Sequence, residues 1–225
     1  MNLSGLFKRQ PKIEGAIGYF GLADWWLSTF SECERERIES LYRPMGHSSP
    51  RPLTQGQIIL TSQRPAQLLW ALAGWLQKPP DRLLARRVLA EALELAEAEG
   101  DVLDQHFTYQ AMIDTFYRDR DTDAEALETA ITACESQIAL APKAALAFRG
   151  EYSDSPLPAH RGFQQLAIIR EKQRNYAEAI RVCRRALEQG WAGDWERRIG
   201  RCEKRADSRS RKRKPSRSAG QQGRS

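Results

Sequence analysis

The feature that most constrains the fold is a run of three amphipathic segments between His160 and Arg205. It reads HRGFQQLAIIREKQRNYAEAIRVCRRALEQGWAGDWERRIGRCEKR, and its apolar residues recur at the three- and four-residue spacing of α-helices. Small residues such as Ala167 and Ala179 alternate with larger ones such as Phe163. Because small side chains let two helices cross closely, the pattern predicts packed helix pairs.

The order of these residues also resembles a repeat family. Phe163, Leu166 and Ala167, followed by Ala179, Cys183 and Ala186, match the large–x–x–Leu–small and Ala–x–x–x–large pattern of the tetratricopeptide repeat, a 34-residue helix–turn–helix unit. Two positions depart from it: Cys183 stands where Phe or Tyr is usual, and Trp191 where Pro is usual. The resemblance implies an all-α fold, a right-handed α-solenoid of helix pairs that binds protein partners.

A second copy of the signature precedes the first. The residues AITAC at 130–134 match AIRVC at 179–183, 49 residues later. We therefore expect helices over 102–118 and 124–140, with an insertion over 143–159. Two further helices are expected over 64–77 and 81–99; they share with the repeat only the order helix, break, helix. The residues expected to face inward in the first are Leu68, Leu69, Leu72 and Trp75. A last helix from Gly193-Asp194 shields the end of the stack.

The N-terminal part predicts a helical cap. Ser31 and Glu34 form a capping-box pattern, so a helix begins there. The preceding DWWLSTF predicts a short helix capped by Asp24. Burial of its two tryptophans in a hydrophobic end cap is favoured over an exposed aromatic platform for a ligand. For 53–63 a short helix is favoured over a strand. Gly15, Gly18 and Gly21 indicate a flexible entry.

The domain organisation follows from these patterns. We expect a flexible entry over 1–20, a helical cap over 21–63, repeats with a capping helix over 64–206, and a disordered basic tail over 207–225. The net charge of +6 is uneven, because residues 204–225 hold nine Lys or Arg and one Asp. The charge pattern therefore predicts a nearly neutral body.

No known chemical motif stands out in the chain. It lacks the phosphate-binding GxxxxGK[ST], the GxSxG elbow and HExxH. Asp104 and His106 are better explained as polar positions on a helix flank than as a catalytic pair. The four cysteines are widely separated, whereas zinc ligands usually come as closely spaced pairs. Each lies among apolar helical neighbours, as small buried thiols do. We expect no enzyme activity, no cofactor and no metal.

Recognition is the function that remains. The repeat resemblance places a partner groove on the first helix of each pair, which implies these side chains: Gln105, Thr108, Met112, Arg161, Gln164, Ile168, Glu171 and Lys172. A peptide or helix of an unidentified protein is the expected ligand. No apolar run is long enough to cross a bilayer, so no membrane partner and a cytoplasmic location are expected.

The tail offers a second hypothesis, in which the protein associates with nucleic acid. Its basic residues are Arg209, Arg211, Lys212, Arg213, Lys214 and Arg217. Such runs bind phosphates weakly and without regard to base sequence. A role in solubility alone is the competing interpretation.

Overall fold

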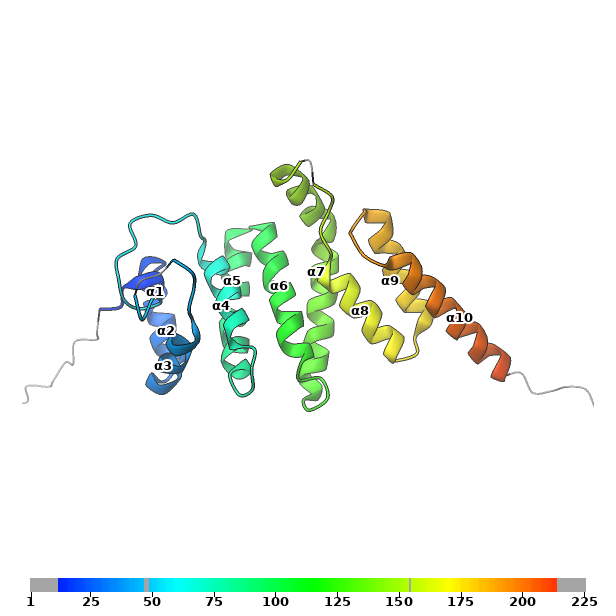
Figure 1. Cartoon of the computed structure of the whole chain (residues 1–225), viewed down its shortest axis with the longest axis horizontal. Coiled ribbons are helices and arrows are strands. Elements are labelled where there is room, and N and C mark those ends of the chain that lie inside the picture. Colours follow the sequence, from blue (N-terminus) through cyan, green and yellow to red (C-terminus); the bar gives the residue numbers. More distant parts are fainter. Residues whose placement is uncertain (1–11, 47–48, 154, 214–225) are drawn as a thin grey trace, which may run out of the picture. The chain divides into compact units, whose positions relative to one another are not determined.

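In the part of the chain that is described, every regular secondary-structure element is a helix. The computed structural model describes residues 12–46, 49–153 and 155–213, with side chains to Ser208. It contains ten α-helices, one 3-10 helix and a single isolated bridge between Ala159 and Ala192 (Figure 1). The all-α prediction is confirmed. The chain divides into two compact units, 1–118 and 119–225.

The N-terminal unit begins with a short helix, α1 (Gly15–Tyr19), where a flexible entry was expected. The backbone N–H groups of residues 14–17 donate to carbonyl oxygens within 52–56, over 2.8–3.1 Å. These bonds satisfy the first turn of the helix from a distant loop. Gly15 has φ +58°, and a Cβ there would lie 2.7 Å from the Leu53 carbonyl. The entry prediction is thus wrong for 15–19, and 1–11 lie outside the described residues.

Two short helices follow, α2 (Ala23–Thr29) and α3 (Glu32–Leu41). The capping box is present, because the Ser31 side chain accepts from the Glu34 N–H and the Glu34 carboxylate accepts from the Ser31 N–H. Asp24 lies inside the first turn of α2 and does not cap it; Leu22 stands at the N-cap without a side-chain bond. Trp26 is buried, and Trp25 is partly buried against the same core.

The loop over 53–63 forms no helix, contrary to expectation. Its first part is held against α1, and Gln57–Thr61 has no regular structure. Two consecutive β-branched residues, Ile58 and Ile59, disfavour a helix here because their side chains lose rotamer freedom in one.

Three helices complete this unit: α4 (Pro65–Ala73), α5 (Arg82–Glu99) and α6 (Val102–Tyr117). They pack side by side, and Gly100 ends α5 in the left-handed conformation. Trp75 lies in the 3-10 helix η1 (Gly74–Leu76) and is 43% exposed, so its predicted inward position is wrong. The tighter 3-10 winding buries Leu76 instead.

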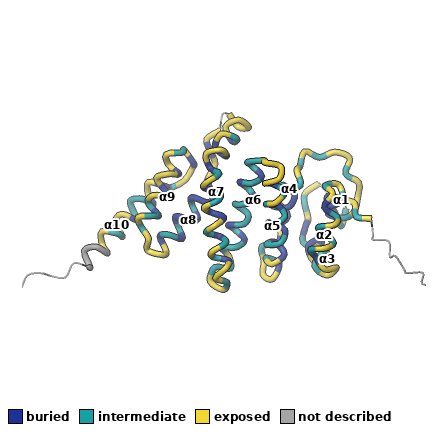
Figure 2. Tube along the Cα trace, turned by 180° about the vertical axis from the view of Figure 1, so that it is seen from behind, coloured by how far each residue is buried: buried dark blue, intermediate teal, exposed yellow. Residues whose placement is uncertain are grey.

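The C-terminal unit consists of α7 (Ala124–Glu151), α8 (Arg161–Lys172), α9 (Tyr176–Gln189) and α10 (Trp195–Arg213). Ala130, Cys134, Ala179 and Cys183 are all fully buried, at the positions that the repeated signature shares. Buried residues concentrate where helices face each other (Figure 2).

The helix expected to end near Leu140 instead runs through Pro142 to Glu151. The continuation buries Ala144, Ala145 and Phe148, and the Phe148 ring meets Trp191 edge-on with 5.9 Å between centroids. This burial offsets the hydrogen bond that a proline removes from a helix. Most of the expected insertion is therefore helix.

Candidate functional site

The predicted partner face of α8 is a row of four side chains. Arg161, Gln164 and Ile168 are half-buried and Lys172 is exposed. They recur at three- and four-residue spacing, so they share one side of the helix. The Arg161 guanidinium donates to the Gln164 side-chain oxygen over 3.4 Å. We call Arg161, Gln164, Ile168 and Lys172 the α8 row.

Glu171, which was predicted to line the same groove, is 9% exposed and engaged by three arginines of α10. Arg201 donates to its two carboxylate oxygens, each over 2.9 Å, while Arg205 reaches it at 2.5 Å and Arg198 at 3.2 Å. The hydrogen bonds from Arg201 are the main reason that the pKa of Glu171 is lowered. Glu171 therefore joins α8 to α10 and is not an open groove residue.

The α6 residues predicted for the groove lie in the other unit. Thr108 is fully buried, so it is not part of an exposed surface. Gln105 donates from its side-chain nitrogen to the Ala96 carbonyl over 3.1 Å, and Met112 packs against the N-terminal core. Gln105 and Met112 are half-buried, so of the three predicted α6 residues only Thr108 is fully removed from the surface.

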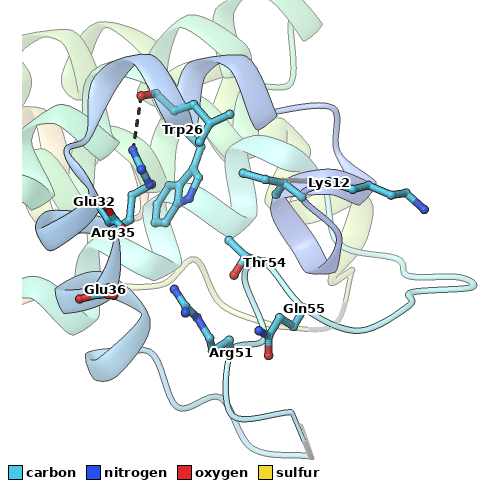
Figure 3. Close-up of a pocket in the computed structure, with 10 residues that line it drawn as sticks. Lys12, Trp26, Glu32, Arg35, Glu36, Arg51, Thr54 and Gln55 are labelled. Carbon is cyan, nitrogen blue, oxygen red and sulfur yellow. Dashed lines mark hydrogen bonds between the residues drawn. The ribbon is translucent and has the colours of Figure 1, made fainter. Parts of the chain in front are cut away.

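A pocket of about 280 Å³ in the N-terminal unit has no counterpart in the sequence-based expectations (Figure 3). Three separate segments line it: Lys12 and Ile13; Trp26, Leu27, Glu32, Arg35 and Glu36; and Arg51, Thr54 and Gln55. The Arg35 guanidinium is engaged within the protein, because it donates hydrogen bonds to the carbonyls of Leu27 and Phe30 at the end of α2. Charged groups of both signs surround the opening, and no nucleophilic Cys or His belongs to the lining.

A smaller pocket of about 160 Å³ lies where α7, α8 and α9 meet. Its apolar residues are Ile138, Phe163, Leu166 and Val182, and its charged residues are Glu135, Glu178, Arg181 and Arg185. Glu178 binds Arg181 over 2.6 Å, and Glu135 binds Arg170 over 3.2 Å. Neither pocket was found from sequence, since each is assembled from residues distant along the chain.

Asp104 and His106 do not form a catalytic pair open to substrate. Both are 1% exposed, and the Asp104 carboxylate accepts a hydrogen bond from Arg64 over 2.5 Å. Burial lowers the pKa of His106 to about 4, so its imidazole is neutral at pH 7. Asp104 instead joins α6 to the residue that precedes α4.

Three of the four cysteines are buried, as expected, but Cys33 is exposed on α3. Burial raises the pKa of Cys183 to about 11, so this thiol stays protonated and unreactive at neutral pH. Among the described residues, no group of three or more His, Cys, Asp or Glu side chains is arranged to hold a metal ion.

The helical backbone extends into the segment that the sequence predicts as a disordered basic tail. Helix α10 runs to Arg213, so the backbones of Arg209, Arg211, Lys212 and Arg213 are helical where disorder was predicted. Lys214 and Arg217 lie outside the described residues. Over the described ranges, no helix is both long and apolar enough to span a membrane.

Comparisons with known proteins leave the chain without an assigned family. No family model, no curated protein and no solved structure matches it.

Proposed function

We propose that this protein is a non-enzymatic binding module of tetratricopeptide-like helix pairs, arranged as an α-solenoid, whose α8 row receives a peptide or helix of a protein partner. The observation that carries this proposal is the division of α8 into two sides. Phe163 and Ala167 are fully buried, whereas the α8 row keeps side-chain surface toward solvent. Ile168 supplies an apolar contact between the positive charges of Arg161 and Lys172, which favours an apolar segment that carries acidic residues.

Site-specific photo-crosslinking in the native cell tests the proposal. A benzophenone amino acid replaces Gln164 or Lys172 in one set of full-length chains and exposed Lys143 of α7 in a control. We expect the same partner to be captured at 164 and 172 and not at 143. Capture of that partner at all three positions, or at 143 alone, would contradict the α8 row.

Association with nucleic acid is the second candidate function. It is favoured by one specific observation: the backbone of α10 remains helical to Arg213, within the basic run 211–214. A helix holds its residues at fixed spacing, so the described cations of α10 up to Arg205 meet a phosphate backbone with less loss of entropy than those of a random coil.

A further inference from the structure

The charged residues of α10 are segregated around the helix. With about 100° between successive residues, Arg197, Arg198, Arg201, Lys204 and Arg205 fall on one arc. Glu196, Glu203 and Asp207 fall on another arc, and buried Trp195 and Cys202 lie between the two. We call the five basic residues the basic flank of α10.

The basic flank faces the C-terminal end of α8. Arg198, Arg201 and Arg205 converge on Glu171; the exposed residue Lys172 ends α8, and exposed Arg174 lies in the turn to α9. Glu171 therefore stands among several cations. Among the described residues, the only other carboxylate paired with a basic-flank residue is Asp194, which binds Arg197 over 2.7 Å and lies 3.7 Å from Arg198. The side chains of Arg201 and Arg205 remain 36% and 52% exposed. A guanidinium has five N–H donors, so both arginines keep donors for a further anion after binding Glu171.

The positive charge is thus not confined to the tail. Residues 161–208 hold twelve Lys or Arg against seven Asp or Glu. On the opposite flank, Glu203 is paired with Arg184 of α9 over 3.2 Å. The excess of positive charge lies on a folded surface with a fixed geometry.

We propose that the basic flank of α10, together with Lys172 and Arg174, binds the phosphate backbone of a nucleic acid. This surface offers charged donors without an apolar anchor, because none of the exposed large hydrophobic residues among the described side chains lies on α10 or at 172–174. A peptide site normally has such an anchor, whereas phosphate contacts need only cations. The five basic residues extend over about 12 Å of helix, a length along which duplex DNA presents several phosphates.

This inference rests on the second candidate function and adds a site on the folded unit to it. The test compares two full-length variants that each lose three positive charges. The site variant is K172Q/R174Q/K204Q, which leaves the contacts of Glu171 with Arg198, Arg201 and Arg205 in place. The control variant is K143Q/R181Q/R184Q, whose residues are also exposed but lie on α7 and α9.

Binding to a fluorescein-labelled 20-base-pair DNA duplex is measured by anisotropy between 50 and 200 mM NaCl. We expect the site variant to bind about tenfold more weakly than the parent at 50 mM. Its log–log salt slope should be shallower by about 0.9 for each phosphate that the variant no longer neutralises. The control should bind within about twofold of the parent, because the three charges that it loses lie outside the proposed phosphate-binding surface.

Three results would overturn the inference: equal weakening of both variants, no binding of the parent chain to the duplex at 50 mM NaCl, or equally tight binding of a ten-residue glutamate peptide. The first would mean that total charge decides binding, and the last that the surface takes carboxylates. None of these outcomes bears on the α8 row, whose crosslinking test uses no nucleic acid.

Discussion

The side-chain oxygen of Gln137 on α7 accepts a hydrogen bond from the backbone N–H of Gly162 on α8, over 2.6 Å. Both residues are buried, and this N–H belongs to the first turn of α8, where no helical carbonyl can receive it. A Cβ at position 162 would lie 2.9 Å from the Cys134 carbonyl oxygen and 2.9 Å from the Gln137 side-chain oxygen. The α7–α8 crossing thus requires a glycine for space.

Gly162→Ala should therefore destabilise the protein by about 1–3 kcal/mol, because the added methyl group overpacks the crossing. Gly200→Ala is the matched control: Gly200 also lies within a helix, and a Cβ there would meet nothing within 4 Å beyond its own turn of helix. There the alanine should stabilise by about 0.5–1 kcal/mol through the better helix propensity. Urea unfolding measures both changes. Equal effects from the two substitutions would show that the α7–α8 contact is looser than described.

Ala179→Phe tests the small-residue position of the repeat signature. Ala179 is fully buried on α9, so a phenyl ring should cost about 1–3 kcal/mol. Ala177→Phe introduces the same ring two residues earlier at an exposed site and should change the unfolding free energy by under about 0.5 kcal/mol. Chemical denaturation distinguishes the two. Parent-like stability of Ala179→Phe would contradict the register assigned to this helix pair.

Periodicity predicted the helices of 161–189 well because the sequence indicates both the buried face and the ends of a helix such as α9. Ala179, Cys183 and Ala186 are spaced for one face, and all three are buried. Asn175 and Gly190 mark the two ends of α9, as a side-chain cap and a left-handed C-cap. Local signals of this kind need no knowledge of the rest of the fold.

The errors came from contacts between distant residues. Nothing near Gly15 indicates that carbonyls of 52–56 will receive the N–H groups of α1. Likewise, Pro142 predicts a helix end locally, and α7 continues because later residues, among them Phe148 against Trp191, are buried in the fold. Glu171 resembled a solvated groove residue because its arginine partners lie about 30 positions away, in α10.

His106 should make stability depend on pH in a window of its own. Its pKa is lowered by burial from 6.5 to about 4, so the unfolded chain binds a proton at pH values where the folded chain does not. The contribution of the neutral imidazole is therefore complete above pH 6.5 and is lost progressively as the pH falls toward 4. Between pH 7 and 5 the loss should reach about 1–2 kcal/mol.

The replacement His106→Gln isolates this contribution, because the amide is polar and does not titrate. Urea unfolding at pH 7, 6 and 5 should show a shallower decline for the variant than for the parent. Both proteins carry the same carboxylates, so the contribution of these groups to the decline cancels in the comparison. Parallel declines would show that another group titrates between pH 7 and 5.

Two truncations separate the helical end of α10 from the residues beyond it. A chain that ends at Lys204 loses Arg205, which donates to Glu171 over 2.5 Å, together with the last turns of the helix. A chain that ends at Arg213 keeps every described contact. If the shorter chain loses about 1 kcal/mol with this charged hydrogen bond, its Tm should fall by about 2–4 °C. The longer chain should have the same Tm as the parent in a calorimetric scan.

A fall in Tm for the chain that ends at Arg213 would mean that residues 214–225 contact the folded unit. An unchanged Tm for the chain that ends at Lys204 would mean that Arg198 and Arg201 alone hold Glu171.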